Sequence, residues 1–136
     1  MWEHFHHQAD IGIRGVGKSM AEALEEAALG LMGVMCQPDN VEAKQKIKIN
    51  CEAPDAELLL IDWLSAIIYE VATRGMLFGR FEVEIVDNKL RGMAWGEEID
   101  HEKHKTVVEV KGATYAELKV VCNKKGQWVA QCVVDV

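Results

Sequence analysis

Apolar residues recur at helical spacing in two parts of the 136-residue chain. In the first, Ser19 and Glu22 match a capping box, and apolar residues then follow every three or four positions as far as Met35. In the second, Asp55 is the expected N-cap and Gly75 the expected stop, with apolar residues covering most of the helix circumference between them. Because such a helix is buried on several sides, we expect it to form the centre of the core.

Elsewhere the pattern alternates with a period of two, which predicts strands. The predicted strands are two short ones within residues 2–16 that meet near residues 8–10, then 41–52, a hairpin of 81–85 and 90–95, a strand 107–111 that bends at Gly112, and a closing hairpin of 118–122 and 128–136. Residues 96–104 form a polar stretch that we expect to be an irregular connection. Runs of strands broken by two helices are typical of the α+β class. We therefore predict one domain, residues 1–136, with two helices packed on a mixed, largely antiparallel sheet.

Composition narrows the possible functions. The net charge of −7 argues against nucleic-acid binding as the main activity, because that affinity rests largely on Lys and Arg. The four cysteines form no C-x-x-C pair, so we expect reduced thiols rather than a zinc or redox site. The apolar run 58–71 is too short and too polar to span a bilayer, and residues 1–4 do not resemble a secretory signal. We therefore expect a cytoplasmic protein without a membrane partner.

Two carboxylates near opposite ends of the chain are candidates for metal binding. Asp10 lies between the apolar residues Ala9 and Ile11, and Asp135 follows the apolar end of the last predicted strand. Closely spaced oxygens suit Ca²⁺ or Mg²⁺, and the two aspartates would converge if the first and last strands are neighbours. The local alternative for Asp10 is an Asx turn, with Gly12 easing the bend.

Two other motifs carry weaker indications. His101 and His104 have a ligand-like spacing, but no cysteine or carboxylate arrangement completes a tetrahedral zinc site. The segment 15–19 has a Gly-Lys-Ser sequence before a helix, and Gly12 stands at the spacing of the first glycine of a phosphate-binding loop, but the strand that precedes it is short. We interpret that segment as a strand end followed by a helix cap.

Taken in order, several segments of the chain resemble the archease family. They are His7–Gly12, similar to that family's His-Thr-Ala-Asp-Ile-Gly; the helix with Asp55, Leu58, Leu59, Trp63 and Leu64; Gly96–Glu97 and His104; Lys111 with Thr114–Tyr115; and Asp135–Val136. Gln8 stands where the family usually has threonine, and Ala116 where a histidine commonly follows Thr-Tyr.

The resemblance implies a compact α+β protein that is an accessory factor, and not itself an enzyme. Its partner would be the RtcB-type RNA ligase, which joins tRNA halves. Such a factor promotes guanylylation of the ligase's active-site histidine and supports repeated turnover. The resemblance also implies a divalent cation, Ca²⁺ being the species associated with the family and Mg²⁺ or Mn²⁺ the alternatives.

Its ligands would be Asp10, Asp135 and the main-chain or terminal oxygen of Val136. The supporting or partner-contacting residues would be His7, Glu97, His104 and Lys111. We expect no direct sequence-specific nucleic-acid binding.

Two alternatives from other classes stay open at this point. One is a stand-alone metal-dependent phosphoester hydrolase that uses Asp10 and His7. The other is a chaperone-like protein-binding module, which the methionine-bearing first helix would favour.

Overall fold

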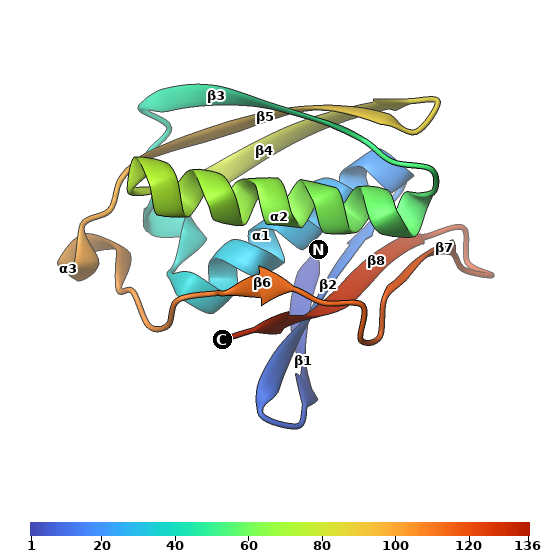
Figure 1. Ribbon diagram of the computed structural model, residues 1–136, viewed down its shortest axis with the longest axis horizontal. Helices are drawn as coiled ribbons and strands as arrows, with labels where there is room; N and C mark the ends of the chain where they lie inside the picture. The colour runs from blue at the N-terminus through green and yellow to red at the C-terminus, as the bar shows by residue number, and fades with distance from the viewer.

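The computed structural model describes residues 1–136 and consists of two β-sheets with two long helices between them (Figure 1). Neither long helix contains a stretch long and apolar enough to cross a membrane. The elements are β1 (Trp2–His7), β2 (Asp10–Gly17), α1 (Met20–Met35), η1 (Pro38–Asn40), β3 (Gln45–Glu52), α2 (Ala56–Arg74), β4 (Met76–Val86), β5 (Lys89–Glu98), α3 (His101–His104), β6 (Gly112–Ala113), β7 (Lys119–Cys122) and β8 (Trp128–Asp135).

The larger sheet joins the two ends of the chain. Its strand order is β1–β2–β8–β6, and β7 also pairs with β8. The central contact is between β2 and β8, where Ile13 lies opposite Cys132 and Ile11 opposite Val134. The first hairpin and the last strand are therefore neighbours, although more than a hundred residues separate them in sequence.

The smaller sheet has the order β3–β5–β4, and both helices pack against one of its faces (Figure 1). Its alternating inward residues, such as Ile47, Phe81 and Ala94, are buried. The β4–β5 hairpin turns at Asp87 and Asn88, which both have positive φ, as a two-residue hairpin turn of type I′ requires.

The predicted helix ends are confirmed. The Ser19 Oγ accepts a hydrogen bond from the Glu22 amide at 3.1 Å, and the Asp55 side chain accepts one from the Leu58 amide at 2.9 Å. Gly75 ends α2 in the left-handed conformation, with φ 61° and ψ 40°. These are local capping interactions, so the sequence alone located them.

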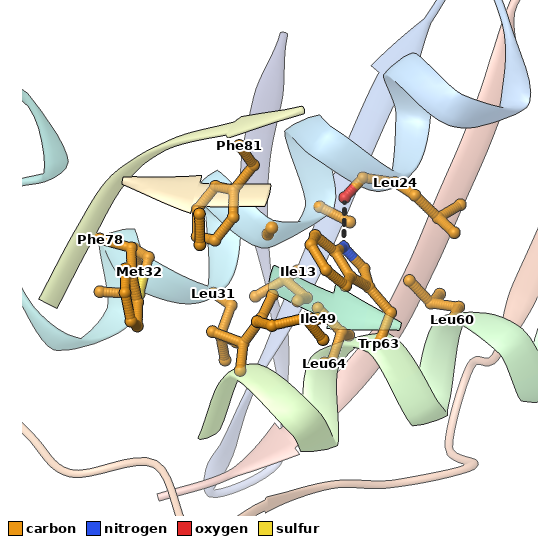
Figure 2. Close-up of a cluster of buried hydrophobic side chains, with 14 of the residues drawn as sticks. Ile13, Leu24, Leu31, Met32, Ile49, Leu60, Trp63, Leu64, Phe78 and Phe81 are labelled. Carbon is orange, nitrogen blue, oxygen red and sulfur yellow. Dashed lines mark hydrogen bonds between the residues drawn. The ribbon is translucent and has the colours of Figure 1, made fainter. Parts of the chain in front are cut away.

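The core is centred on Trp63 of α2, as Figure 2 shows. This side chain is fully buried, and its Nε1 donates a hydrogen bond to the Leu24 carbonyl of α1 at 3.0 Å. The indole ring meets Phe81 of β4 edge to face, with ring centroids 5.8 Å apart. Gly92 of β5 lies so close to the same ring that an added Cβ would overlap it. One residue thus connects both helices to the smaller sheet.

The structure corrects three predictions of secondary structure, those for residues 96–104, 41–52 and 107–111. Residues 96–98 belong to β5, residues 101–104 form the short helix α3, and β3 begins at Gln45 rather than at residue 41. Residues 107–111 are irregular and only Gly112–Ala113 pair with β8. In addition, every strand pair is antiparallel, so the sheets are not mixed.

Two of these errors have clear physical reasons. The polar residue Glu97 is buried inside β5 because charged and polar groups from other segments satisfy it. In the other segment, the Val107 amide bonds to the Met35 carbonyl at the end of α1 and the Lys111 amide to the Asp135 carbonyl. The chain there spans from a helix end to a strand end, and only its last residue bonds to a strand.

The expectation of reduced thiols is consistent with the structure, because all four cysteines are free. Burial raises the pKa of the Cys132 thiol to about 12 and the pKa values of Cys36 and Cys51 to about 11. These three thiols are therefore protonated and unreactive at neutral pH.

Candidate functional site

Four strands of the larger sheet begin or end in one row of residues at the same edge of the sheet. His7 of β1 lies opposite Asp10 of β2, and Gly112 of β6 lies opposite Asp135 of β8. The β2–β8 register pairs Ile11 with Val134, and one step further along both strands it places Asp10 opposite Asp135. Residues directly opposite each other in an antiparallel pair share a face of the sheet. The two aspartate side chains therefore project from the same face of the sheet, next to each other.

This arrangement is unfavourable without a counter-charge, because like charges directly opposite on adjacent strands destabilise a sheet. Asp10 is half-buried, Asp135 is exposed, and neither side chain makes a hydrogen bond or ion pair within the protein. No direct hydrogen bond or ion pair within the fold therefore neutralises the two carboxylates.

The donor set is one of oxygens, which fits a hard cation rather than zinc. The structure contains no group of three or more His, Cys, Asp or Glu side chains placed to hold a metal ion. A cation at this position would have two side-chain carboxylates, and main-chain oxygens and water would have to complete its shell. Main-chain oxygens near Val136 lie next to Asp135 in the chain. The residues therefore fit a Ca²⁺ or Mg²⁺ site in which the protein supplies only a few of the oxygen ligands and water supplies the rest.

The local alternative for Asp10, an Asx turn eased by Gly12, is wrong. The turn consists of Gln8 and Ala9, with Gln8 at a φ of 52°, and Asp10 caps no amide. Gly12 lies within β2, and the Phe5 ring of β1 covers it so closely that an added Cβ would overlap the ring. Gly12 therefore permits packing across the hairpin and does not bend the chain.

Interactions on the same face hold these strands in register. The Arg14 guanidinium lies 4.7 Å from the centroid of the Phe5 ring. Its Nη1 donates to Glu3 of β1 at 2.7 Å, and its Nε donates to Gln131 of β8 at 2.8 Å. Arg14 thus connects β1, β2 and β8 two rows away from the aspartates, which supports their alignment.

Glu97 and His104 come together in a second cluster, which belongs to β5 and α3 and not to the larger sheet. His104 is fully buried, and its Nε2 lies 3.0 Å from Glu97 Oε2. The Asp100 amide donates to Nδ1 of the same ring at 2.9 Å. Because Nδ1 is an acceptor, Nε2 carries the hydrogen and donates it to Glu97.

Three further donors surround the Glu97 carboxylate. The Glu42 amide donates at 2.7 Å, Lys103 Nζ approaches to 2.8 Å and Lys44 Nζ to 3.3 Å. The Glu42 amide, followed by His104 and Lys103, holds the pKa of Glu97 well below its usual range. Glu97 is therefore ionised at all physiological pH values, and it ties α3 and the start of β3 to the end of β5.

Lys111 is exposed, and its amide donates to the Asp135 carbonyl at 2.8 Å. It therefore lies directly beside the carboxylate pair, as does His7 in the opposite direction along the row. The seven predicted site residues thus separate into two groups. His7, Asp10, Lys111, Asp135 and Val136 share one end of the larger sheet, whereas Glu97 and His104 form the second cluster.

Sequence reasoning missed the residues that complete both groups. Lys44, Lys103 and Glu42 surround Glu97, and Phe5, Arg14 and Gln131 align the strands that carry the aspartates. Their contacts join segments far apart in the chain, so no local pattern indicates them. The Phe5–Gly12 pair could have been predicted from the sequence, because an aromatic residue often packs over a glycine on the neighbouring strand of a hairpin.

Residues 2–136 match the model of the Archease protein family (MTH1598/TM1083). The chain belongs to the archease family. It is 43% identical to the protein archease of Pyrococcus furiosus and 31% identical to that of Methanosarcina mazei, with 99% of this chain covered in both cases and 98% and 95% of the relatives.

The solution structure of protein 1598 from Methanobacterium thermoautotrophicum superposes with a TM-score of 0.85. Its sequence identity is 32%, and the match covers 99% of this chain and 98% of that one. The family and the α+β fold class predicted from the sequence are thereby confirmed.

Proposed function

We propose that this protein is an accessory factor of the RtcB-type RNA ligase in tRNA splicing. It promotes guanylylation of the ligase histidine and supports multiple turnover, and it has no catalytic activity of its own. Membership of the archease family supports the role as an accessory protein of tRNA processing. The single observation that carries the mechanism is the facing pair of carboxylates, Asp10 and Asp135.

In this proposal Asp10 and Asp135 hold a divalent cation together with a main-chain oxygen of Val136. Ca²⁺ is the cation we propose, with Mg²⁺ and Mn²⁺ as alternatives. A bound cation would supply positive charge for ordering the nucleotide phosphates at the ligase centre. Without it, the carboxylate pair would repel those phosphates.

The other residues of the row have supporting roles. Lys111 and His7 flank the aspartates on opposite sides, and they present a positive charge and an imidazole to the ligase. Glu97 and His104 do not touch this site. Their contacts fix α3 against the end of β5. The chain leaves α3 toward Lys111, so these contacts fix where that segment starts. We assign them positioning roles.

The test is a ligase guanylylation assay with the variants Asp10→Ala and Asp135→Ala and the double variant. Removing a ligand should reduce the stimulation by roughly tenfold or more. Asp62→Ala is the matched control, because Asp62 is an exposed carboxylate on α2 that makes no hydrogen bond or ion pair. Stimulation by the double variant at the parent level would contradict the proposal.

The same preparations distinguish the hydrolase alternative. The factor alone, incubated with generic phosphoester substrates and divalent metals, should show no turnover. Turnover that depends on Asp10 and His7 would instead support a metal-dependent hydrolase.

A further inference from the structure

The outer face of the smaller sheet is free of both helices, which pack on the opposite face (Figure 1). The strand register identifies the residues of this face, since they alternate with the buried ones. They are Lys46, Lys48, Asn50 and Glu52 of β3, Lys89, Arg91, Met93 and Trp95 of β5, and Arg80, Glu82, Glu84 and Val86 of β4. We call this set the outer β5 face.

Its charge is opposite to that of the whole protein. The outer β5 face contains five of the fifteen Lys and Arg residues, but only three of the twenty-two Asp and Glu residues. Two of the three acids are on β4, and one of them, Glu82, is paired with Arg80 at 2.8 Å. The part formed by β3 and β5 is therefore basic on a chain whose net charge is −7.

Trp95 lies in the middle of one row across this face. Its cross-strand neighbours are Lys46 on one side and Arg80 on the other. The Arg80 guanidinium lies 4.5 Å from the centroid of the indole ring, and the ring is half-buried. The core does not require a tryptophan here, because the adjacent residues Ala94 and Gly96 face inward and are buried.

A half-buried indole with cations on both sides has the chemistry of a single-stranded nucleic-acid site. Bases stack on aromatic rings whatever their identity, while Lys and Arg neutralise the phosphates beside them. Arg80 extends the stacking surface, because a guanidinium also stacks on flat rings. Lys48 occupies the next row along β3 and adds a third positive charge beside this site.

We propose that the outer β5 face binds single-stranded RNA, with one base stacked on Trp95 and the adjacent phosphates bound by Lys46, Lys48 and Arg80. Binding of this kind is independent of base sequence, because the protein contacts the ring face and the phosphates and not the hydrogen-bonding edges of the bases. The activity goes beyond the proposed function, and it does not involve Asp10 or Asp135. It would give the factor its own contact with the RNA that the ligase joins.

The test measures binding of a fluorescein-labelled ten-nucleotide single-stranded RNA to the full-length protein by fluorescence anisotropy, without ligase. Trp95→Ala should raise the Kd roughly tenfold, whereas Trp95→Phe, which keeps a stacking ring, should stay within about threefold of the parent. With three phosphate contacts, log K should fall with log salt with a slope of about −2.

The double variant Lys46→Glu/Lys48→Glu should weaken binding by more than tenfold and flatten the salt dependence. Lys124→Glu/Lys125→Glu is the matched control, since these exposed lysines lie in the turn between β7 and β8 of the other sheet. Circular dichroism and the unfolding midpoint of each variant separate lost binding from lost folding.

Three results would overturn the inference. They are no binding by the parent protein, unchanged binding by both Trp95→Ala and Lys46→Glu/Lys48→Glu, and competition by a poly-glutamate peptide that equals competition by RNA. The last would show that this face binds acidic chains of any kind. Asp10→Ala should bind RNA like the parent, so a failure here is distinguishable from a failure of the ligase proposal.

Discussion

Glu97 is a buried charge with four donors around its carboxylate. Unpaired, such a carboxylate would be strongly destabilising, but here an amide, an imidazole and two ammonium groups satisfy it. Since these donors come from residues 42–44 and 103–104, the side chain connects three segments of the fold.

The lowered pKa of Glu97 predicts how stability depends on pH. An unfolded glutamate titrates near pH 4.3, so Glu97 binds a proton in the unfolded state before it does so in the folded state. Its contribution to stability is therefore complete above about pH 5 and is lost as the pH falls below that value.

The measurement compares the parent with Glu97→Gln by urea unfolding between pH 7 and pH 2.5. At pH 7 the variant should be less stable by about 1–3 kcal/mol, because donors around a buried site lose their charged acceptor. The difference should shrink as the pH falls through 4. A difference that stays constant over this range would show that the ionised carboxylate is not what stabilises the cluster.

At the scale of elements, α2 is joined to α1 and to the smaller sheet through one side chain. Trp63 contacts α1 through its hydrogen bond to Leu24 and the smaller sheet through Phe81 and Gly92. Another side of the same helix faces solvent and includes Tyr69, which is 64% exposed. The two aromatic residues are six positions apart in the helix but differ completely in burial.

This contrast predicts unequal effects of the same truncation. Trp63→Ala should lower the free energy of unfolding by about 3–5 kcal/mol, because it leaves a large cavity between the layers. Tyr69→Ala, the control on the same helix, should change it by less than about 0.5 kcal/mol. Equal losses in urea unfolding would contradict the assignment of Trp63 to the centre of the core.

On the scale of the whole molecule, the carboxylate pair exists only when the first and last strands are paired. A cation held by Asp10 and Asp135 therefore binds the folded protein and not the unfolded chain. Such binding stabilises the fold by about 2.7 kcal/mol when the free cation is at a hundred times its Kd.

We expect Ca²⁺ to raise the unfolding midpoint of the parent in a concentration-dependent way, and to leave Asp10→Asn and Asp135→Asn unchanged. In a chelator, each variant should be as stable as the parent or slightly more stable, by about 0.2–1 kcal/mol, because repulsion between like charges is relieved. Repeating the titration with Mg²⁺ and Mn²⁺ ranks the three cations by the shift in unfolding midpoint that each produces. An equal Ca²⁺ shift in the parent and the double asparagine variant would contradict the proposed ligands.

Much of the secondary structure was predictable because its determinants are local. Helix caps at Ser19 and Asp55, the stop at Gly75 and the turn at Asp87–Asn88 each depend on residues within four positions of one another. The sequence itself named Asp10 and Asp135 as candidate ligands, and the resemblance to a family added Val136. Their convergence, in contrast, depended on a strand pairing that no local pattern specifies.

By itself, then, the sequence determined where the helices begin and end, which faces of the helices and of strands such as β3 are apolar, and which family the chain resembles. Only the tertiary structure decided three other features. It placed Asp10 opposite Asp135, buried Glu97 in a strand that looked like a polar loop, and gathered basic residues around Trp95 on an acidic protein. Each of these depends on pairing between segments distant in sequence, and such pairing is selected by the packing of the whole core rather than by neighbouring residues.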